Sequence, residues 1–421
     1  MADSPMSAAV RTGARNPAML MAAASAILLL TMGVRQSLGL FVLPIVTATG
    51  VSLVSVSFAL AIGQFVWGAA QPLFGAVADH YGAYRVLIWG AVLLAVGGAL
   101  ATRSSSGAGF ALTLGIMLSA GTAAGSFAIL IGVTTGSLPP ERRSLAAGII
   151  NAGGSLGQLL FAPLVQLVIR GSGWRMGMLG ISIAALLTVP IAWLFRGHST
   201  GHAAESTAAA SEPPTRSIGL REQLRVALRD PSYLYLNAGF FTCGFHIAFL
   251  VTHLPGNLAL CGLSATVAAN SLALIGAFNV VGSLFVGWLG RQYRMKSILA
   301  WLYASRAAVV VCYLWMPKTA FNVYLIAGAL GFSWLATVPP TAGLVGKLFG
   351  TRYLTTLFGL TLLSHQIGGF LGAWLGGVAM ARLGSYDWVW YADIVLALAA
   401  ALINLPIKEA VPPRALAGAA A

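Results

Sequence analysis

The sequence predicts an all-α membrane protein with twelve transmembrane helices in two pseudo-symmetric six-helix bundles. First, the chain of 421 residues is 58% hydrophobic and only 8% charged, whereas a soluble domain carries about 25% charged residues. Second, apolar runs of about 20 residues, long enough to cross a hydrocarbon core, recur from end to end. Third, the two halves of the chain resemble each other. Since a backbone in lipid must satisfy its own hydrogen bonds, and the runs are longer than barrel strands, the spans should be helices.

The apolar runs set the order of the elements. The first run is too long for a signal-peptide core and lacks a small-residue cleavage site in a polar flank, so it is expected to be a true span. The first six spans are predicted at 19–45, 53–78, 84–102, 108–137, 144–170 and 174–195, and the second six at 232–256, 264–289, 296–316, 321–346, 354–380 and 387–406. The chain then divides into a tail at 1–18, a bundle at 19–196, a linker at 197–231, a bundle at 232–407 and a tail at 408–421. The linker is rich in Ser, Pro and Ala and includes a short amphipathic segment near Ile218–Leu228.

The basic residues predict an orientation. Most of the 24 lysines and arginines fall on one side of the membrane if both termini are cytoplasmic. The net charge of +14 therefore reflects the attraction of basic loops to the inner leaflet, and no nucleic-acid partner is needed to explain it. We expect a multi-pass protein of a bacterial inner (cytoplasmic) membrane, surrounded by lipid and monomeric.

The two halves align as a parallel repeat. Residues 50–81 match 262–293, and residues around 148–157 match those around 359–368; the aligned pairs are Gly50 with Gly262, Gly75 with Gly287, Tyr81 with Tyr293, Gly148 with Gly359 and Gly157 with Gly368. Both halves start on the same side, so the repeat axis runs along the membrane normal. Such an architecture favours a binding site at the midplane, between the halves.

One loop resembles a signature of the major facilitator superfamily. The stretch GAVADHYGAYR at 75–85 is similar to the superfamily's loop between the second and third spans, with Gly75, Asp79, Gly82 and Arg85 in place. The second half keeps a degenerate copy, with Arg291 where the aspartate would fall. The resemblance implies that Asp79 and Arg85 form a gate latch; a plain surface ion pair is the alternative.

Shorter motifs resemble one branch of that superfamily, the monocarboxylate porters and oxalate–formate antiporters. They are VRQSLGLFVLPI in the first span, ERRSLAAGIINAGGSLGQ at 141–158 and SGWRMG at 172–177. The resemblance implies transport of a small carboxylate by alternating access. The chain departs from the branch in the eighth span, where Asn279 and Ser283 stand in place of an acid or arginine, and this departure weighs against proton coupling of the branch's kind.

Arg35 is the residue that most clearly indicates a ligand-binding site. It lies about 24 Å from one end of its span and about 15 Å from the other, too deep to reach water comfortably. A guanidinium there costs from about 3 to more than 10 kcal/mol unless it meets water or an anion. Apart from Asp387, the first residue of the last span, the spans enclose one carboxylate, Asp393, near the outer start of the same span. A bound carboxylate, which suits guanidinium in a two-pronged geometry, is the predicted partner; bonding to helix carbonyls or amides is the alternative.

Other polar residues recur on single helix faces. Gln64, Trp67 and Gln71 share one face, and Asn151, Ser155 and Gln158 share another, where lipid offers no partners. Helix–helix bonding and substrate contact both explain them. The predicted substrate-binding residues are Arg35, Gln64, Trp67, Asn151, Gln158, His246, Asn279 and His365.

Histidines and a second arginine extend the list of intramembrane polar groups. A histidine can donate to a carboxylate or carry a proton, so His246, His253 and His365 are candidates, with packing as the alternative. For Arg306, in the peripheral ninth span, a structural contact with a neighbouring helix is favoured over a role in substrate binding. The histidine spacing is weak evidence for metal, and Cys243, Cys261 and Cys312 lack ligand spacing. No metal, cofactor or catalytic residue is therefore predicted.

The functional hypothesis is a secondary transporter for a small organic anion, a monocarboxylate or related acid, working by proton symport or anion exchange. The chain has no Walker loop and no H-E-x-x-H motif, and an intramembrane enzyme would need paired catalytic groups, so no enzyme is predicted. Efflux of drugs or of neutral or anionic metabolites is the second hypothesis; cationic drugs would require a buried acid. A non-transporting sensor ranks last, because it would need an added soluble domain.

Overall fold

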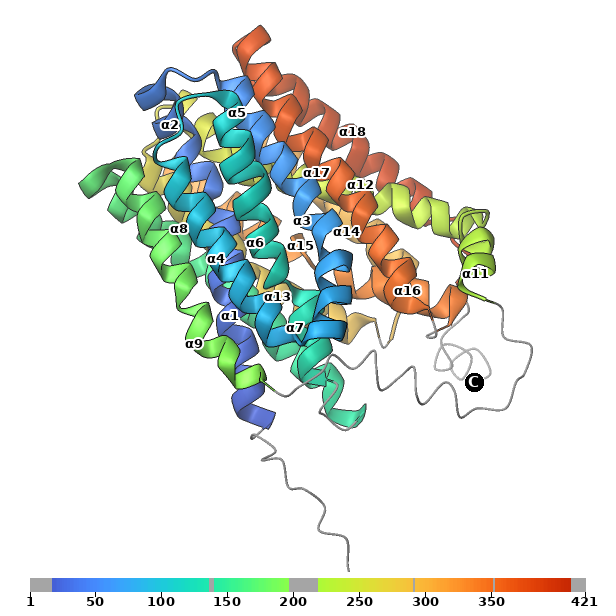
Figure 1. Ribbon diagram of the computed structural model, residues 1–421. Helices are drawn as coiled ribbons and strands as arrows, with labels where there is room; N and C mark the ends of the chain where they lie inside the picture. The colour runs from blue at the N-terminus through green and yellow to red at the C-terminus, as the bar shows by residue number, and fades with distance from the viewer. Residues whose placement is uncertain (1–16, 136–139, 197–218, 291, 351–352, 410–421) are drawn as a thin grey trace, which may run out of the picture.

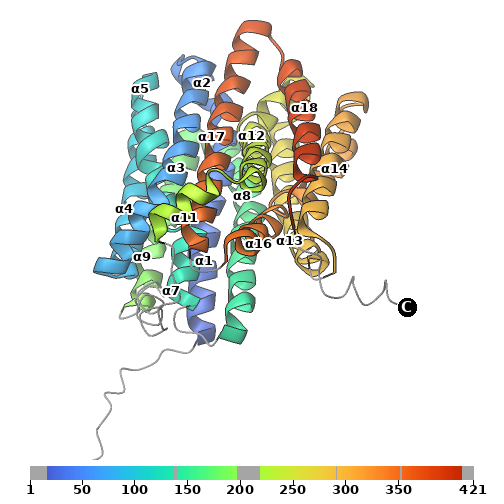
Figure 2. The same cartoon turned by 90° about the vertical axis from the view of Figure 1, so that its right-hand side faces the viewer.

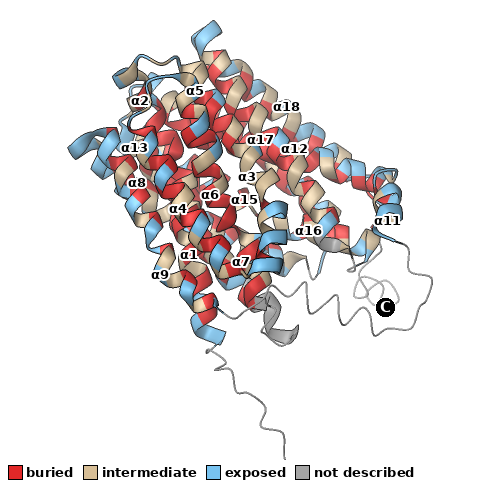
Figure 3. Cartoon of the chain, in the orientation of Figure 1, coloured by how far each residue is buried: buried red, intermediate tan, exposed pale blue. Residues whose placement is uncertain are grey.

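The computed structural model describes residues 17–135, 140–196, 219–290, 292–350 and 353–409. Within these ranges the chain is helical and has no strand. The helices run roughly antiparallel to their neighbours and gather into two groups that lie side by side (Figures 1 and 2). Buried residues occupy the interior and exposed residues the outer surface (Figure 3). Much of that outer surface is apolar, as in Trp89, Leu167 and Leu284, which is what lipid requires.

The first half begins with a span that is not one continuous helix. Helix α1 (Pro17–Ser37) is followed by the 3₁₀ turn η1 (Leu38–Phe41) and by α2 (Val42–Thr49). The fourth span is also segmented and includes a π-helical stretch, η2. The remaining elements of this half are α3 (Leu53–Tyr81), α4 (Ala83–Ala101), α5 (Gly107–Phe110), η2 (Ala111–Leu118), α6 (Ser119–Ala124), α7 (Phe127–Thr135), α8 (Pro140–Leu186), α9 (Thr188–Ala192) and η3 (Trp193–Phe195).

The second half follows the linker. A short helix, α11 (Leu220–Ala227), precedes it and confirms the predicted amphipathic segment. The spans are α12 (Pro231–Leu260), α13 (Ala265–Leu289), α14 (Met295–Trp315), α15 (Ala320–Ser333) with α16 (Val338–Phe349), α17 (Leu354–Leu383) and α18 (Asp387–Asn404). The break between α15 and α16 coincides with Pro339 and Pro340, which cannot donate the backbone hydrogen bonds of a continuous helix.

The described helices account for the predicted spans. Within the part of the chain that the structure describes, ten candidate spans meet the length and hydropathy requirement of a membrane helix. One of them, Gly148–Phe195, contains two predicted spans, because α8 is interrupted at Gly173, whose φ of 82° is non-helical. Helix α17, with 30 residues, is a further long helix. The prediction of an all-α membrane protein with two six-span halves is confirmed.

Two helix pairs join the halves: α3 packs along α17, and α8 packs along α13. We call the end of the molecule that carries Arg85, Arg294 and Lys347 the basic end, and the other end the opposite end. On α3 and α17 the contacts run from Ser57 against Gly377, at the opposite end, to Gly68 against Gln366 in the middle. Farther toward the basic end, glycines of the four interface helices border open space: Gly75, Gly148, Gly287 and Gly359. The contacts between the halves that these glycines mark thus lie in the middle and at the opposite end.

Candidate functional site

Arg35 lies in the last turn of α1, immediately before η1 interrupts the first span. Its Nη2 donates a hydrogen bond to Oε1 of Gln64, and its Cζ lies 4.2 Å from the centre of the Trp67 ring. Both partners come from α3, one turn apart, as their sequence spacing predicted. The guanidinium is partly buried and, within the described ranges, forms no ion pair. Neutral groups therefore position a cation whose charge is not neutralised by protein.

A small cavity adjoins Arg35 and lies between the halves. Its lining includes Arg35, Gln64 and Ser119 from the first half and Val251 and Thr252 from the second. The hydroxyl groups of Ser119 and Thr252 are buried. The cavity thus combines one cation, an amide and hydroxyls with apolar walls, which is the composition expected of a site for a small polar ligand.

The cavity is closed toward the opposite end by a close backbone approach. A Cβ atom on Gly39, in η1, would lie 1.8 Å from the carbonyl oxygen of Val251 on α12. Only glycine permits the first span to approach the second half this closely. The break in the first span and Gly39 together bring Arg35 next to residues of both halves.

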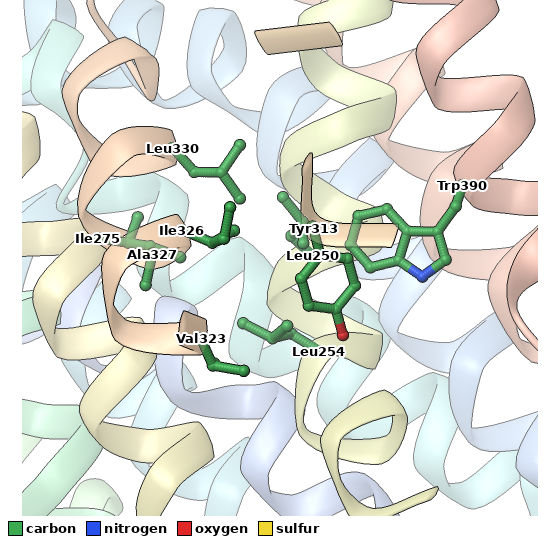
Figure 4. A pocket seen from close by; sticks show the side chains of 9 residues that line it. All are labelled: Leu250, Leu254, Ile275, Tyr313, Val323, Ile326, Ala327, Leu330 and Trp390. Atoms are coloured by element: carbon green, nitrogen blue, oxygen red, sulfur yellow. The ribbon is translucent and has the colours of Figure 1, made fainter. Parts of the chain in front are cut away.

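A second pocket has a different character. It lies entirely within the second half and is lined by apolar and aromatic side chains, among them Leu250, Tyr313 and Trp390 (Figure 4). None of its lining residues is basic. This pocket offers no counter-charge for an anion, so the Arg35 cavity is the better candidate site.

The polar stripes predicted on α8 and α13 mostly join helices. The amide of Gln36 donates to Oε1 of Gln158 across 3.4 Å within the first half. Asn279 connects the two halves: its Nδ2 donates to Oγ of Ser155 at 2.9 Å, and its Oδ1 accepts from the backbone N–H of Leu335 at 3.0 Å. Asn151 is partly buried on α8. For Gln158 and Asn279, the helix–helix alternative accounts for the described contacts.

His365, on α17, lies near the site. It is 8% exposed, its Nδ1 is 3.1 Å from Nε2 of Gln366, and its ring packs 4.8 Å from that of Phe240. It interacts electrostatically with both Arg35 and Arg306. His365 is therefore placed between the cavity and the interior of the second half.

His246 lies elsewhere, in the interior of the second half. It is fully buried, and its Nδ1 is 2.6 Å from Oδ2 of Asp393 on α18. The His246–Asp393 pair joins residues 147 positions apart, and no local sequence signal indicated it. Arg306 donates to the backbone carbonyl oxygens of Ser333 and Trp334, so the structural contact favoured for it from the sequence is present.

The predicted latch is described only in part. The side chain of Asp79 lies outside the described residues. Arg85 is exposed, and its Nε donates to the hydroxyl of the adjacent Tyr84 at 2.9 Å. Nor is a metal site indicated, since the described residues include no group of three or more histidine, cysteine, aspartate or glutamate side chains that could hold an ion.

Comparison with known proteins identifies the family. The model of the Major Facilitator Superfamily matches residues 19–373. The chain belongs to this superfamily. It is accordingly a multi-pass integral membrane protein of a transporter family.

Relatives within the superfamily are similar along most of the chain. Monocarboxylate transporter 13 of Bos taurus is 27% identical over 385 residues, covering 90% of this chain and 86% of that protein. The oxalate:formate antiporter of Oxalobacter formigenes is 23% identical over 406 residues, covering 92% and 90%. These are members of the branch that the short motifs resembled.

A solved structure supports the fold. The bacterial homologue of the human lysosomal transporter Spinster, in an inward-facing and unoccupied conformation, superposes with a TM-score of 0.72 at 15% identity, covering 93% of this chain and 97% of that one. At this identity the likeness establishes the fold and does not bear on the substrate.

Proposed function

We propose that this protein is a secondary transporter for a small organic anion, a monocarboxylate or a related carboxylic acid. The observation that carries the proposal is Arg35, a partly buried intramembrane cation beside a cavity between the halves, with an amide and an indole ring as its described partners. A carboxylate would supply the missing negative charge, and a charge-assisted, two-pronged contact with guanidinium is among the stronger polar interactions.

The residues around Arg35 also favour a carboxylate as the ligand. Gln64 and Trp67 hold the guanidinium without neutralising it, and the indole Nε1–H of Trp67 has no acceptor among the described residues. Ser119 and Thr252 add hydroxyl groups from both halves, of which that of Ser119 donates to the carbonyl oxygen of Leu114 in the described arrangement. A ligand held by both halves would favour their closure around it, which is how binding energy can drive a carrier between its two arrangements.

The arrangement of the halves suggests which side is open. If the basic end faces the cytoplasm, as the distribution of lysine and arginine favours, the described contacts close the outer side. Substrate would then exchange with the cytoplasm in this arrangement. The similarity to monocarboxylate transporters and to an oxalate:formate antiporter supports an organic anion as the substrate and leaves both symport and exchange as modes.

Thermal stabilisation of the purified protein by carboxylates tests the proposal. A panel of formate, oxalate, acetate, L-lactate and an aromatic acid would be compared with chloride on the wild type, on Arg35→Gln and on Arg170→Gln. Arg170 is exposed at the far end of its span and controls for the loss of one positive charge. We expect at least one carboxylate to raise the melting temperature of the wild type and of Arg170→Gln, but not of Arg35→Gln.

Two outcomes would contradict the proposal: no carboxylate stabilises the wild type, or the same shift survives in Arg35→Gln. Arg35 would then be a structural residue bonded to Gln64, and export of neutral compounds would become the better hypothesis. The residues that line this cavity are uncharged apart from Arg35, so the cavity offers no counter-charge for a cationic drug.

A further inference from the structure

A cluster of buried polar groups lies inside the second half, apart from the cavity. It comprises His246 on α12, Arg306 on α14, Asp393 on α18 and Trp334 at the break between α15 and α16. All four are fully buried. Three helices and the break in a fourth span bring these groups together, although a buried charge is costly without a function or a full set of partners.

Arg306 binds the break in the tenth span. Helix α15 ends at Ser333, and α16 begins at Val338. The guanidinium Nη2 donates to the carbonyl oxygens of Ser333 at 2.7 Å and of Trp334 at 3.1 Å. These carbonyls are at the C-terminal end of a half-helix, where the helix dipole favours a cation. Arg306 thus stabilises this particular geometry of the break.

His246 and Asp393 form the other part of the cluster. His246 Nδ1 and Asp393 Oδ2 are 2.6 Å apart, and when Asp393 is ionised it can only accept, so that Nδ1 carries the hydrogen of this contact. The second ring nitrogen, Nε2, has no hydrogen-bond partner among the described residues, and neither do Asp393 Oδ1 and Arg306 Nε and Nη1. The cluster therefore keeps one free basic nitrogen, one free carboxylate oxygen and two free guanidinium nitrogens.

We propose that this cluster is a proton-binding site, with Nε2 of His246 as the atom that binds the proton, and that its protonation controls the contact between the two halves. The proposal rests on the proposed function as a transporter and adds a ligand, the proton, and a site separate from the Arg35 cavity. A proton from water binds the lone pair of Nε2 and returns to water when the site opens; no other bond forms or breaks.

The cluster can adopt two arrangements, one with the proton bound and one without it, and in each of them Asp393 is paired with a different partner. With the proton bound, imidazolium and Asp393 form a charge-assisted pair, the imidazolium faces the Trp334 ring 6.0 Å away, and Arg306 remains on the carbonyls. Without it, neutral imidazole holds Asp393 less strongly. Asp393 and Arg306 already interact electrostatically, and their free atoms Oδ1, Nε and Nη1 can then pair, which draws the guanidinium away from the break.

The break is connected directly to the other half. Leu335, adjacent to Trp334, donates its backbone N–H to Oδ1 of Asn279, whose Nδ2 donates to Oγ of Ser155 on α8. Movement of the carbonyls at Ser333 and Trp334 displaces this N–H. Loss of the proton should therefore weaken the bond between Asn279 and Ser155, and acidification should favour the described arrangement, closed at the opposite end.

The titratable and charged groups around His246 are few. On α12 there is Cys243, whose Sγ lies 3.3 Å from the hydroxyl of Thr337. Helix α14 carries Tyr303 and Arg306, and α18 carries Asp393. Helix α17 carries His365, which is close enough to Arg306 for an electrostatic interaction. Helix α13 carries no titratable residue. His246 is the only one of these groups that combines a carboxylate partner with a free basic nitrogen.

Pulsed electron paramagnetic resonance on reconstituted protein tests the proposal without a substrate. One spin label is placed on native Cys261, which is exposed near the end of α12, and the other on Leu167→Cys, on α8. Cys312 is exchanged for Ser, and buried Cys243 is kept. In the wild-type background we expect the label distance to shorten as the pH is lowered from about 8 to about 4, a range that extends below the ordinary titration of histidine because burial disfavours the charged imidazolium.

Three variants decide the outcome. His246→Gln keeps a donor for Asp393 but cannot bind the proton, and Asp393→Asn removes the carboxylate; both should abolish the pH-dependent change. His253→Gln is the matched control, because His253 is also buried on α12 but its described hydrogen bond is to the carbonyl of Ala373, so the change should persist. A wild type without a pH-dependent distance, or an unchanged response in folded His246→Gln, would overturn the proposal.

The result separates this inference from the proposed function. Thermal stabilisation by formate and L-lactate, measured at a fixed pH, depends on Arg35 and should persist in His246→Gln. Carboxylate binding without a pH-dependent distance would refute the proton site alone. A pH-dependent distance that requires His246, in a protein that binds no carboxylate, would refute the anion substrate alone.

Discussion

The two intramembrane arginines have opposite surroundings. Arg306 is fully buried, donates to two backbone carbonyls and has Asp393 nearby. Arg35 is partly buried, borders a cavity and is held by an amide and an aromatic face. Arg306 has two backbone acceptors for its Nη2, although its Nε and Nη1 have no hydrogen-bond partner among the described residues. Arg35 has no described ionic partner. The comparison teaches that the position of a cation in a span matters less than what surrounds it: Arg306 is bonded to the backbone of a neighbouring span, and Arg35 is positioned beside a cavity without a counter-charge.

The largest expected effect is the difference in stability between variants that lack one or the other arginine. Arg306→Gln leaves two buried carbonyls at the break without their donor and removes the cation near Asp393, and a hydrogen bond to a charged group is worth about 1.5–3 kcal/mol. Arg35→Gln removes a cation that has no ionic partner and should cost far less. Melting temperatures in detergent should therefore fall markedly for Arg306→Gln and little for Arg35→Gln; the reverse order would refute the assignment of roles.

The close approach at Gly39 should control closure at the opposite end. A valine there would collide with the carbonyl of Val251, so Gly39→Val should shift the population toward an arrangement open at that end. The distance between labels at Cys261 and Leu167→Cys should lengthen. Gly171→Val is the control, since a Cβ there meets no atom within 4 Å. Equal distances in the two variants would show that Gly39 is not a closing contact.

The hydrogen bond between Asn279 and Ser155 should have a smaller effect. Asn279→Ala removes one buried bond between the halves, worth about 1 kcal/mol, and should change the ratio of the two arrangements by about fivefold in the same label experiment. Asn270→Ala serves for comparison, because Asn270 bonds Tyr324 within one half. If Asn270→Ala altered the distances as much as Asn279→Ala, the bond between the halves would have no special role.

The aromatic face above Arg35 should have the smallest effect. Trp67→Leu removes a cation–π contact worth about 1 kcal/mol but leaves Gln64 in place. Carboxylate affinity, measured by titration calorimetry, should fall by about fivefold without being lost. Trp89→Leu, on an exposed side chain of α4, should leave it unchanged. Complete loss of binding in Trp67→Leu would indicate that the indole itself, and not the guanidinium, recognises the ligand.

Much of the fold could be predicted because its signals are local. Span length, the paired halves and the short helix at Leu220–Ala227 follow from apolar runs and periodicity, and the bend at Gly173 falls between two predicted spans. The shared face of Gln64 and Trp67 follows from helical spacing, but their contact with Arg35 was not predicted: the bond to Gln64 is the amide alternative given for this arginine.

The remaining site features could not be predicted because they depend on tertiary contacts. His246 was expected in the substrate site, and Asp393 was given no partner, because nothing local brings α12 and α18 together at that height. Asn279 was aligned with the first half by the repeat, yet its bond to Ser155 depends on how far the halves have closed. Periodicity thus predicts the helix face on which a residue lies. It does not identify the partner that this residue contacts on another helix.

The most direct test of the central claim is exchange transport in proteoliposomes containing purified protein. Vesicles loaded with unlabelled formate, oxalate or L-lactate would be given a trace of the same labelled anion outside. The account predicts transient accumulation of at least one anion by the wild type and by Arg170→Gln, and none by Arg35→Gln. Accumulation that is unaffected in Arg35→Gln, or no exchange of any carboxylate by folded wild-type protein, would contradict it.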